Sequence, residues 1–74
     1  MAALRTWRLE RARADAVPPY VIAHDSTLAH IAERRPGSLS ALARVPGIGP
    51  AKLDKYGLQI LAVVAELSAR PQSA

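Results

Sequence analysis

Hydrophobic residues recur at helical spacing at the start of this chain. Leu4, Trp7 and Ala12 share one stripe with Arg8, which predicts a helix from about residue 3 to residue 14. An arginine on an apolar stripe can lay its methylene stem along the core while its guanidinium reaches an acid or a carbonyl. We therefore expect Arg8 to have a structural role.

A proline pair interrupts this pattern. In the stretch VPPYVIA, Pro18 and Pro19 lack amide donors, and Pro18 pushes Val17 toward an extended conformation. We therefore expect a proline-rich loop between residues 17 and 23. Its prolines and its isolation argue against a β-strand.

Two further helices are predicted between residues 25 and 45. Asp25, Ser26 and Thr27 offer N-cap side chains for the first of them, and the Pro-Gly pair at 36–37 ends it. Ser38 can cap a shorter helix. The apolar positions that this shorter helix would bury are Leu39, Leu42 and Val45.

From Pro50 onward the apolar residues keep helical spacing nearly to the C-terminus. We expect Gly57 to separate a short fourth helix from a longer fifth. Residues 70–74 are expected to fray, so residues 1–74 form one predicted domain with a core from about 4 to 67. The predicted fold class is all-α, a compact bundle of about five helices with a proline-rich loop after the first.

Composition narrows the function further. With 74 residues and no cysteine, the chain is one small domain without disulfides or thiolate metal sites, which suggests a reduced, intracellular setting. No signal peptide or membrane-length apolar run is apparent, so we expect no membrane association. A net charge of +4 favours a polyanionic partner, although a solvated basic face explains it equally well.

Catalytic, metal and cofactor sites are not expected. His24 and His30 are six residues apart, so on a helix they would point about 240° from one another and could not share a metal. The acids are scattered, and the sequence offers no nucleophile, base and orienting group. The phosphate-binding pattern GxxxxGK[ST] is also missing.

The stretch VPGIGPAK allows two interpretations. Gly47 and Gly49 permit positive φ, so nearby amides could converge on a phosphate, with Lys52 and Arg44 on either side. Against this, Pro50 removes one amide, and any short loop between two helices needs glycine for its geometry. In isolation the stretch favours a tight corner over a phosphate clamp.

The aromatic and lysine side chains also allow either a structural role or a role in binding nucleic acid. Tyr20, in the proline loop, could stack on an unpaired base, but in isolation a role in the core is favoured. Trp7 and Tyr56 are expected in the core. Lys55 and Lys52 form either a small basic ridge or an ordinary solvated face.

Surface arginines complete the candidate set. Arg5, Arg11 and Arg13 lie off the apolar stripe of the first helix or at its edge, where they could face phosphates. Arg34, with Arg35, follows the second helix, where both also oppose the negative end of the helix dipole.

Three segments together resemble the HRDC domain, the helicase and RNase D C-terminal module: LRTWRLERA, VPPYVIAHDSTLAHIA and RPGSLSALARVPGIGPAKLDKYGLQIL. The resemblance implies a bundle of about five helices that is not catalytic and commonly binds single-stranded or branched nucleic acid weakly. It places Tyr20, Lys52 and Lys55 at the family's aromatic and basic positions. The G-x-G of Gly47 and Gly49 also resembles the helix-hairpin-helix element of DNA repair proteins.

The resemblance leaves three functions open. The first is an accessory domain, monomeric in isolation, of a bacterial, cytoplasmic and nucleoid-associated RecQ-like helicase, which would tune the DNA structures that the helicase engages. The second is a protein-interaction module that docks on the catalytic core of the parent enzyme. The third is the RNA-binding accessory domain of a nuclease similar to ribonuclease D.

Overall fold

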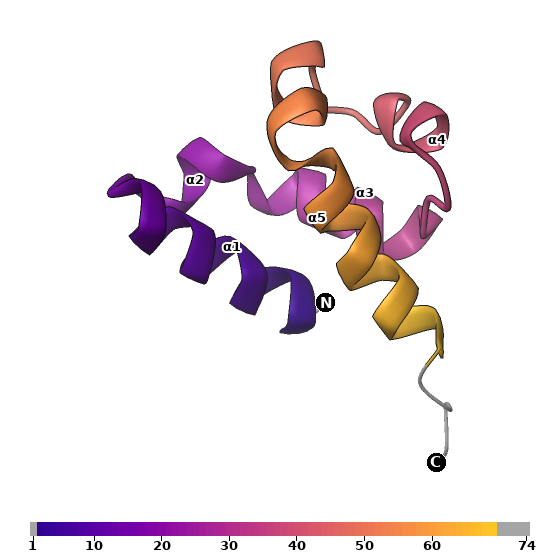
Figure 1. Ribbon diagram of the computed structural model, residues 1–74, viewed down its shortest axis with the longest axis horizontal. Coiled ribbons are helices and arrows are strands. Elements are labelled where there is room, and N and C mark those ends of the chain that lie inside the picture. Colours follow the sequence, from indigo (N-terminus) through magenta and orange to yellow (C-terminus); the bar gives the residue numbers. More distant parts are fainter. Residues whose placement is uncertain (1, 70–74) are drawn as a thin grey trace.

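The computed structural model describes residues 2–69, with side chains as far as Leu67. These residues form five helices and no strand, so the all-α fold class is confirmed (Figure 1). The expectation for residues 70–74 lies outside the described residues. The helices are α1 (Ala2–Asp15), α2 (Pro19–Ile22), α3 (Asp25–Arg34), α4 (Leu39–Ala43) and α5 (Pro50–Ala69).

The proline segment contains a short helix where we expected only a loop. Val17 and Pro18 do break α1, but Pro19 then begins the four-residue helix α2. Proline suits the first position of a helix because its missing amide would have no partner there and its φ is already helical. Ile22, at the end of α2, is buried and anchors the helix in the core.

The start of α3 also differs from the prediction. His24 occupies the N-cap position and makes no side-chain capping bond, while Asp25 is the first helical residue. The helix ends as predicted before Pro36, with Arg35 in the left-handed conformation at φ 45°. The predicted cap of α4 is confirmed, because the amide of Ala41 donates to Ser38 Oγ at 3.1 Å.

Gly57 does not divide the C-terminal segment. Helix α5 runs without a break from Pro50 to Ala69, and α2 supplies the fifth helix of the bundle instead. Gly57 serves a close approach between helices, since an added Cβ atom would lie 2.8 Å from Leu39 Cδ2 on α4. The break was predicted wrongly because the contact that uses this glycine comes from another helix.

All five helices contribute to one hydrophobic core. Its largest fully buried side chains are Leu4, Ile22, Leu28, Ile31, Leu42 and Ile60. Val45 is buried as expected, whereas Leu39 is 41% exposed, which corrects its predicted burial.

The two aromatic side chains expected in the core lie where α1 meets α5. The rings of Trp7 and Tyr56 are 5.9 Å apart between centroids and nearly perpendicular, the edge-to-face arrangement that aromatic pairs favour. Trp7 is partly buried against the core, and its Nε1 donates to Gln59 Oε1 at 3.1 Å. Tyr56 is buried and its hydroxyl donates to Asp15 Oδ2 at 2.6 Å, which ties the end of α1 to α5.

Candidate nucleic-acid interface

Tyr20 is exposed rather than buried, contrary to the role in the core that the isolated residue favours. It is 61% exposed on α2, where the short helix turns its ring away from Ile22 and the core. The ring stacks against His24, with centroids 6.3 Å apart and planes 25° from parallel. An exposed ring of this kind is the feature that single-strand binding proteins use to stack bases.

Next to the stacked rings of Tyr20 and His24, Arg8 of α1 contacts the start of α3. Arg8 Nη1 donates to the carbonyl of Ala23 at 3.0 Å and pairs with Asp25 Oδ1 at 2.7 Å. The structural role expected of Arg8 is thus confirmed. The hydrogen bond from Arg8 lowers the pKa of Asp25, and the charge of Arg5 lowers it further, so Arg5 lies within electrostatic reach of the same turn.

The hairpin between α4 and α5 packs on the same turn of α3. Gly47 has φ of 92°, and an added Cβ atom would collide with the hydroxyl of the buried Thr27. Gly47 therefore has the positive φ that the sequence allowed for this pair of glycines, and it also lies close against Thr27. Gly49 has neither, since its φ is not positive and nothing lies within 4 Å of its added Cβ atom. The positive φ that the sequence allowed at Gly49 is absent because α5 begins directly after it. Its role in binding nucleic acid stays a prediction.

The start of α5 leaves amides available beside the hairpin. The amide of Leu53 donates to the carbonyl of Gly49 at 2.9 Å, and Pro50 has no amide hydrogen. The amides of Ala51 and Lys52 precede that first helical bond, so they have no carbonyl one turn earlier in the helix. A phosphate at this end of α5 would find two amides and the positive end of the helix dipole.

Three elements therefore meet at the first turn of α3. Helix α1 brings Arg8, α2 brings Tyr20, which stacks on the N-cap residue His24, and the hairpin brings Gly47. Neither His24 nor Thr27 was predicted to contribute here. Neither contact had a local signal, because the backbone is extended at Ala23 and His24 and the four-residue spacing from Tyr20 to His24 is therefore not a helical one.

Other basic side chains lie near carboxylates on a different part of the bundle. Asp15 accepts from Arg11 at 2.9 Å and lies 3.8 Å from Lys55 Nζ, while it also accepts from Tyr56. The hydrogen bond from Tyr56 is the largest cause that lowers the pKa of Asp15, and the hydrogen bond from Arg11 is the next largest. Asp15 is four residues from Arg11, a spacing that favours helical ion pairs, so the sequence did carry a signal for part of this network.

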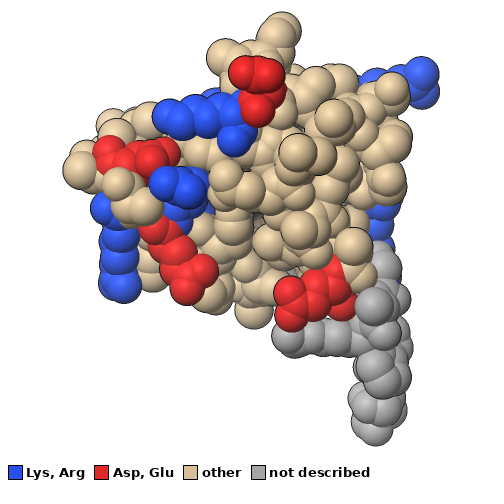
Figure 2. Space-filling model, viewed as in Figure 1, with Lys and Arg blue, Asp and Glu red and all other residues tan. Residues whose placement is uncertain are grey.

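The remaining candidate cations form no ion pair with Asp15 or Asp25. Arg34 Nη1 donates to the carbonyl of Arg44 at 3.3 Å, at the opposite end of α3 from Tyr20. Among residues 2–67, no acid lies within ion-pair distance of Arg5, Arg13, Arg44 or Lys52. On the face that Figure 2 draws, blue and red groups lie close together around a wide uncharged area, and no continuous basic band crosses it.

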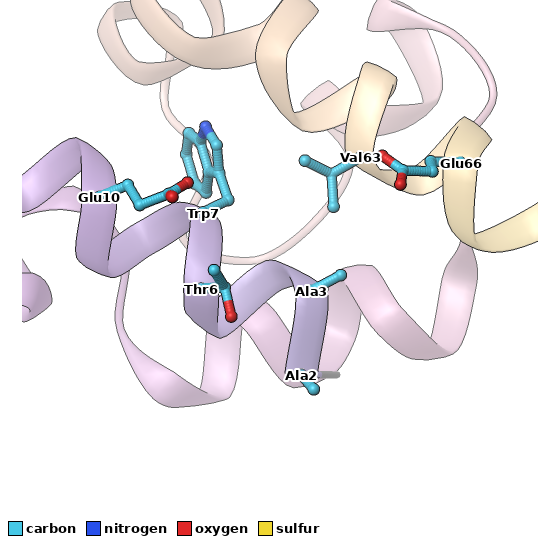
Figure 3. Close-up of a pocket in the computed structure, with 7 residues that line it drawn as sticks. All are labelled: Ala2, Ala3, Thr6, Trp7, Glu10, Val63 and Glu66. Atoms are coloured by element: carbon cyan, nitrogen blue, oxygen red, sulfur yellow. The ribbon is translucent and has the colours of Figure 1, made fainter.

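The cavity between α1 and α5 is unsuited to nucleic acid. It has a volume of about 460 Å³ and lies between α1 and the second half of α5, and Figure 3 shows Glu10 and Glu66 projecting from these two helices on either side of it. Two carboxylates beside one cavity would repel a phosphate backbone. Its remaining lining residues are Ala2, Ala3, Thr6, Trp7 and Val63.

The described residues hold no arrangement that suggests a metal or a membrane. Between residues 2 and 67, no three histidine or acidic side chains come together as metal ligands. None of the helices in the described part of the chain is both long and apolar enough to cross a bilayer.

The fold and this turn define a small helical accessory module. The HRDC domain profile matches residues 1–64 of the chain. The chain belongs to the HRDC domain family, which confirms the resemblance, and HRDC is a non-catalytic accessory domain of helicases.

The relatives that the chain resembles are DNA helicases. The ATP-dependent DNA helicase UvrD2 of Mycobacterium tuberculosis is 46% identical over 61 residues, which cover 82% of this chain and 9% of that protein. The ATP-dependent DNA helicase RecQ of Haemophilus influenzae is 32% identical over 65 residues, which cover 88% of this chain and 10% of that protein. The chain thus spans only about a tenth of the length of these relatives.

The fold is also similar to a solved structure. HRDC domain 3 of D. radiodurans RecQ superposes with a TM-score of 0.90 at 32% sequence identity. The alignment covers 93% of this chain and 91% of that one, so the similarity extends over nearly the whole bundle.

Proposed function

We propose that this domain binds single-stranded or branched DNA weakly and thereby tunes which DNA structure an attached ATP-dependent helicase engages. The parent would be a bacterial, cytoplasmic and nucleoid-associated helicase related to RecQ or UvrD2. Both named relatives are DNA helicases, which favours DNA over the RNA of a nuclease parent.

The observation that carries this proposal is the exposed ring of Tyr20 at the turn where α1, α2 and the hairpin meet. A base that stacks on Tyr20 would lie at the start of α3, where Arg8 pairs with Asp25 and Thr27 packs on Gly47. Arg5, whose charge acts on Asp25, would contact the backbone of that strand. Lys52 and Arg44, which flank the hairpin, would then contact the backbone of the same strand.

Acidic neighbours limit the strength of this contact. Asp25 faces Arg8, and Asp15 faces Arg11 and Lys55, so these cations offer less charge to a phosphate than their number suggests. Arg34, at the opposite end of α3 from Tyr20, would contact a second strand, and Arg13 would add to the positive charge that the domain offers to DNA. A few phosphate contacts of this kind give micromolar or weaker affinity that falls steeply with salt.

Titration of labelled single-stranded and forked DNA across a series of salt concentrations tests the proposal. We expect the logarithm of the affinity to fall with the logarithm of the salt concentration, with a slope of about −0.7 for each phosphate neutralised on single strands. A folded domain that binds neither DNA at low salt would refute the proposal.

The role of Tyr20 has its own test and a matched control. Tyr20→Ala should weaken binding of single-stranded DNA by about 1–3 kcal/mol, the usual contribution of one stacked base. Val21→Ala, next to it on α2 and 45% exposed, removes apolar surface without removing a ring. Equal affinities for the two variants would show that stacking on Tyr20 contributes nothing.

A further inference from the structure

The side chain of His24 is exposed beside Tyr20, and its ring nitrogens have no partner in the described part of the chain. The backbone is extended at Ala23 and His24, and this link between α2 and α3 brings the imidazole against the Tyr20 ring. The centroid distance of 6.3 Å and the angle of 25° are those of an offset stack. His24 is the N-cap residue of α3, but its side chain makes no capping bond. Its nitrogens are therefore open to a ligand that stacks on Tyr20.

The charged groups around His24 largely cancel one another. From α1, Arg8 pairs with Asp25 at 2.7 Å, and the charge of Arg5 acts on the same carboxylate. From α2, the phenol of Tyr20 is the only titratable group, and residues 45–49 of the hairpin have no titratable side chain. Because Asp25 neutralises Arg8, their ion pair adds no net charge at the start of α3. A proton on His24 would therefore add a positive charge directly beside the exposed ring.

The chemistry of imidazole makes this added charge depend on pH. Histidine is the side chain whose ordinary pKa lets its charge change between about pH 5 and pH 8. A protonated imidazole has two N–H donors and a positive charge, whereas the neutral ring has one donor and no charge. Hydrogen bonds from a charged donor to a phosphate are about twice as strong as neutral ones. A nucleotide stacked on Tyr20 would thus be held more tightly by the protonated form.

We propose that His24 is a second nucleic-acid-binding residue beside Tyr20 and that its protonation strengthens the binding of single-stranded DNA. The inference rests on the proposed function, because it adds a residue and a pH control to the same site. Proton and DNA binding are reciprocal, so bound DNA favours the proton on His24 by the same factor by which the proton favours DNA. A stack of rings that only stabilises the fold has no such coupling.

Titration of a labelled oligothymidylate at about pH 5.5 and about pH 7.5 tests this inference, because thymine bases do not titrate between these values. We expect the unchanged domain to bind about fivefold more tightly at the lower pH, the factor that corresponds to two unit charges about 4 Å apart in water. The slope of the logarithm of affinity against the logarithm of salt concentration should also steepen by about 0.7 at the lower pH. This is the value of one more phosphate neutralised on a single strand.

Three variants separate the charge of His24 from its ring. His24→Phe keeps an aromatic ring beside Tyr20 without a titratable group, so it should bind as the unchanged domain does at about pH 7.5 and gain nothing at about pH 5.5. His24→Arg is charged at both pH values and should bind at the tighter level at both. His30→Gln is the control, because His30 is the only other histidine of the chain and lies further along α3. This control should keep the fivefold effect of pH.

Two results would overturn the inference and leave the DNA-binding function standing. One is an unchanged domain that binds DNA equally well at the two pH values, and the other is a pH effect of the same size in His24→Phe. Circular dichroism checks that each variant is folded. Should His24→Phe not fold, His24→Arg decides the question, because it must exceed the unchanged domain at about pH 7.5 and match it at about pH 5.5. Absence of DNA binding by the folded domain at both pH values would refute the proposed function itself, and this inference with it.

Discussion

Replacement of Gly47 by alanine should remove a large part of the stability of this domain. The backbone of Gly47 has φ of 92°, a conformation that alanine rarely adopts. Its new Cβ atom would collide with Thr27 Oγ1 and lie 3.2 and 3.3 Å from the two carbon atoms Cβ and Cγ2 of that side chain. Thr27 is 3% exposed, so it has little room to move.

The expected loss has two parts. Forcing alanine into this backbone conformation costs about 1–3 kcal/mol, and overpacking a buried site costs about 1–3 kcal/mol more. The sum of about 2–6 kcal/mol compares with a total free energy of unfolding of about 4–11 kcal/mol for a domain of this length. The melting temperature should therefore fall by about 10 °C or more.

Urea unfolding measures this loss. Far-UV circular dichroism reports the helices, and the fluorescence of Trp7, the single tryptophan of the chain, reports the contact between α1 and α5. Gly37→Ala is the matched control, because Gly37 has no positive φ and nothing lies within 4 Å of its added Cβ atom. The control should be unchanged or stabilised by about 0.4–1 kcal/mol, through the lower entropy of its unfolded chain.

A double variant separates the two parts. With Thr27→Ala the hydroxyl that meets the new Cβ atom is gone, whereas the backbone strain at Gly47 stays. The double variant should therefore lose less free energy of unfolding than the sum of the two single changes. The reasoning fails if Gly47→Ala unfolds at the same urea concentration as Gly37→Ala.

Two further predictions concern the ends of helices. The hydrogen bond from the Tyr56 hydroxyl lowers the pKa of Asp15 in the folded state. The Asp15 carboxylate therefore stabilises the fold at every pH above its unfolded-state pKa, which is near 4. This stabilisation is lost as the pH falls through the lower folded-state pKa. Asp15→Asn should flatten the decline of the melting temperature between about pH 5 and pH 2, and an unchanged decline would contradict this account. Ser38→Ala should cost about 1 kcal/mol in urea unfolding, because the cap of α4 loses its acceptor, whereas Ser38→Gly should cost only a few tenths; equal losses would show that the capping bond contributes little.

Most of the helices could be predicted because their signals are local. Prolines, the Ser38 cap and apolar periodicity each act within about one turn of the chain, so α1, α3 and α4 were located from residues close to one another. The same local rules failed at Gly57, where a contact from α4 explains the glycine and the helix continues. They also failed at Asp25, whose carboxylate pairs with Arg8 on another helix instead of capping its own.

The candidate site was predictable only as a set of residue types. Tyr20 and the hairpin were both suspected from the sequence, but nothing local indicated that both lie against the start of α3. Exposure of the Tyr20 ring depends on how α2 packs on α1, which no spacing within the proline segment reveals.

The sequence by itself determined the family, the all-α class and the net positive charge of this domain, because motifs, periodicity and composition need no knowledge of distant contacts. Apart from the pair of Arg11 and Asp15 within α1, only the tertiary structure decided which cations stand beside carboxylates. Asp15 joins Tyr56 across 41 residues of sequence and draws in Lys55, and Asp25 holds Arg8 across two helices. Electrostatic attraction depends on separation in space, so the charges of this chain acquired their roles only when folding brought them together.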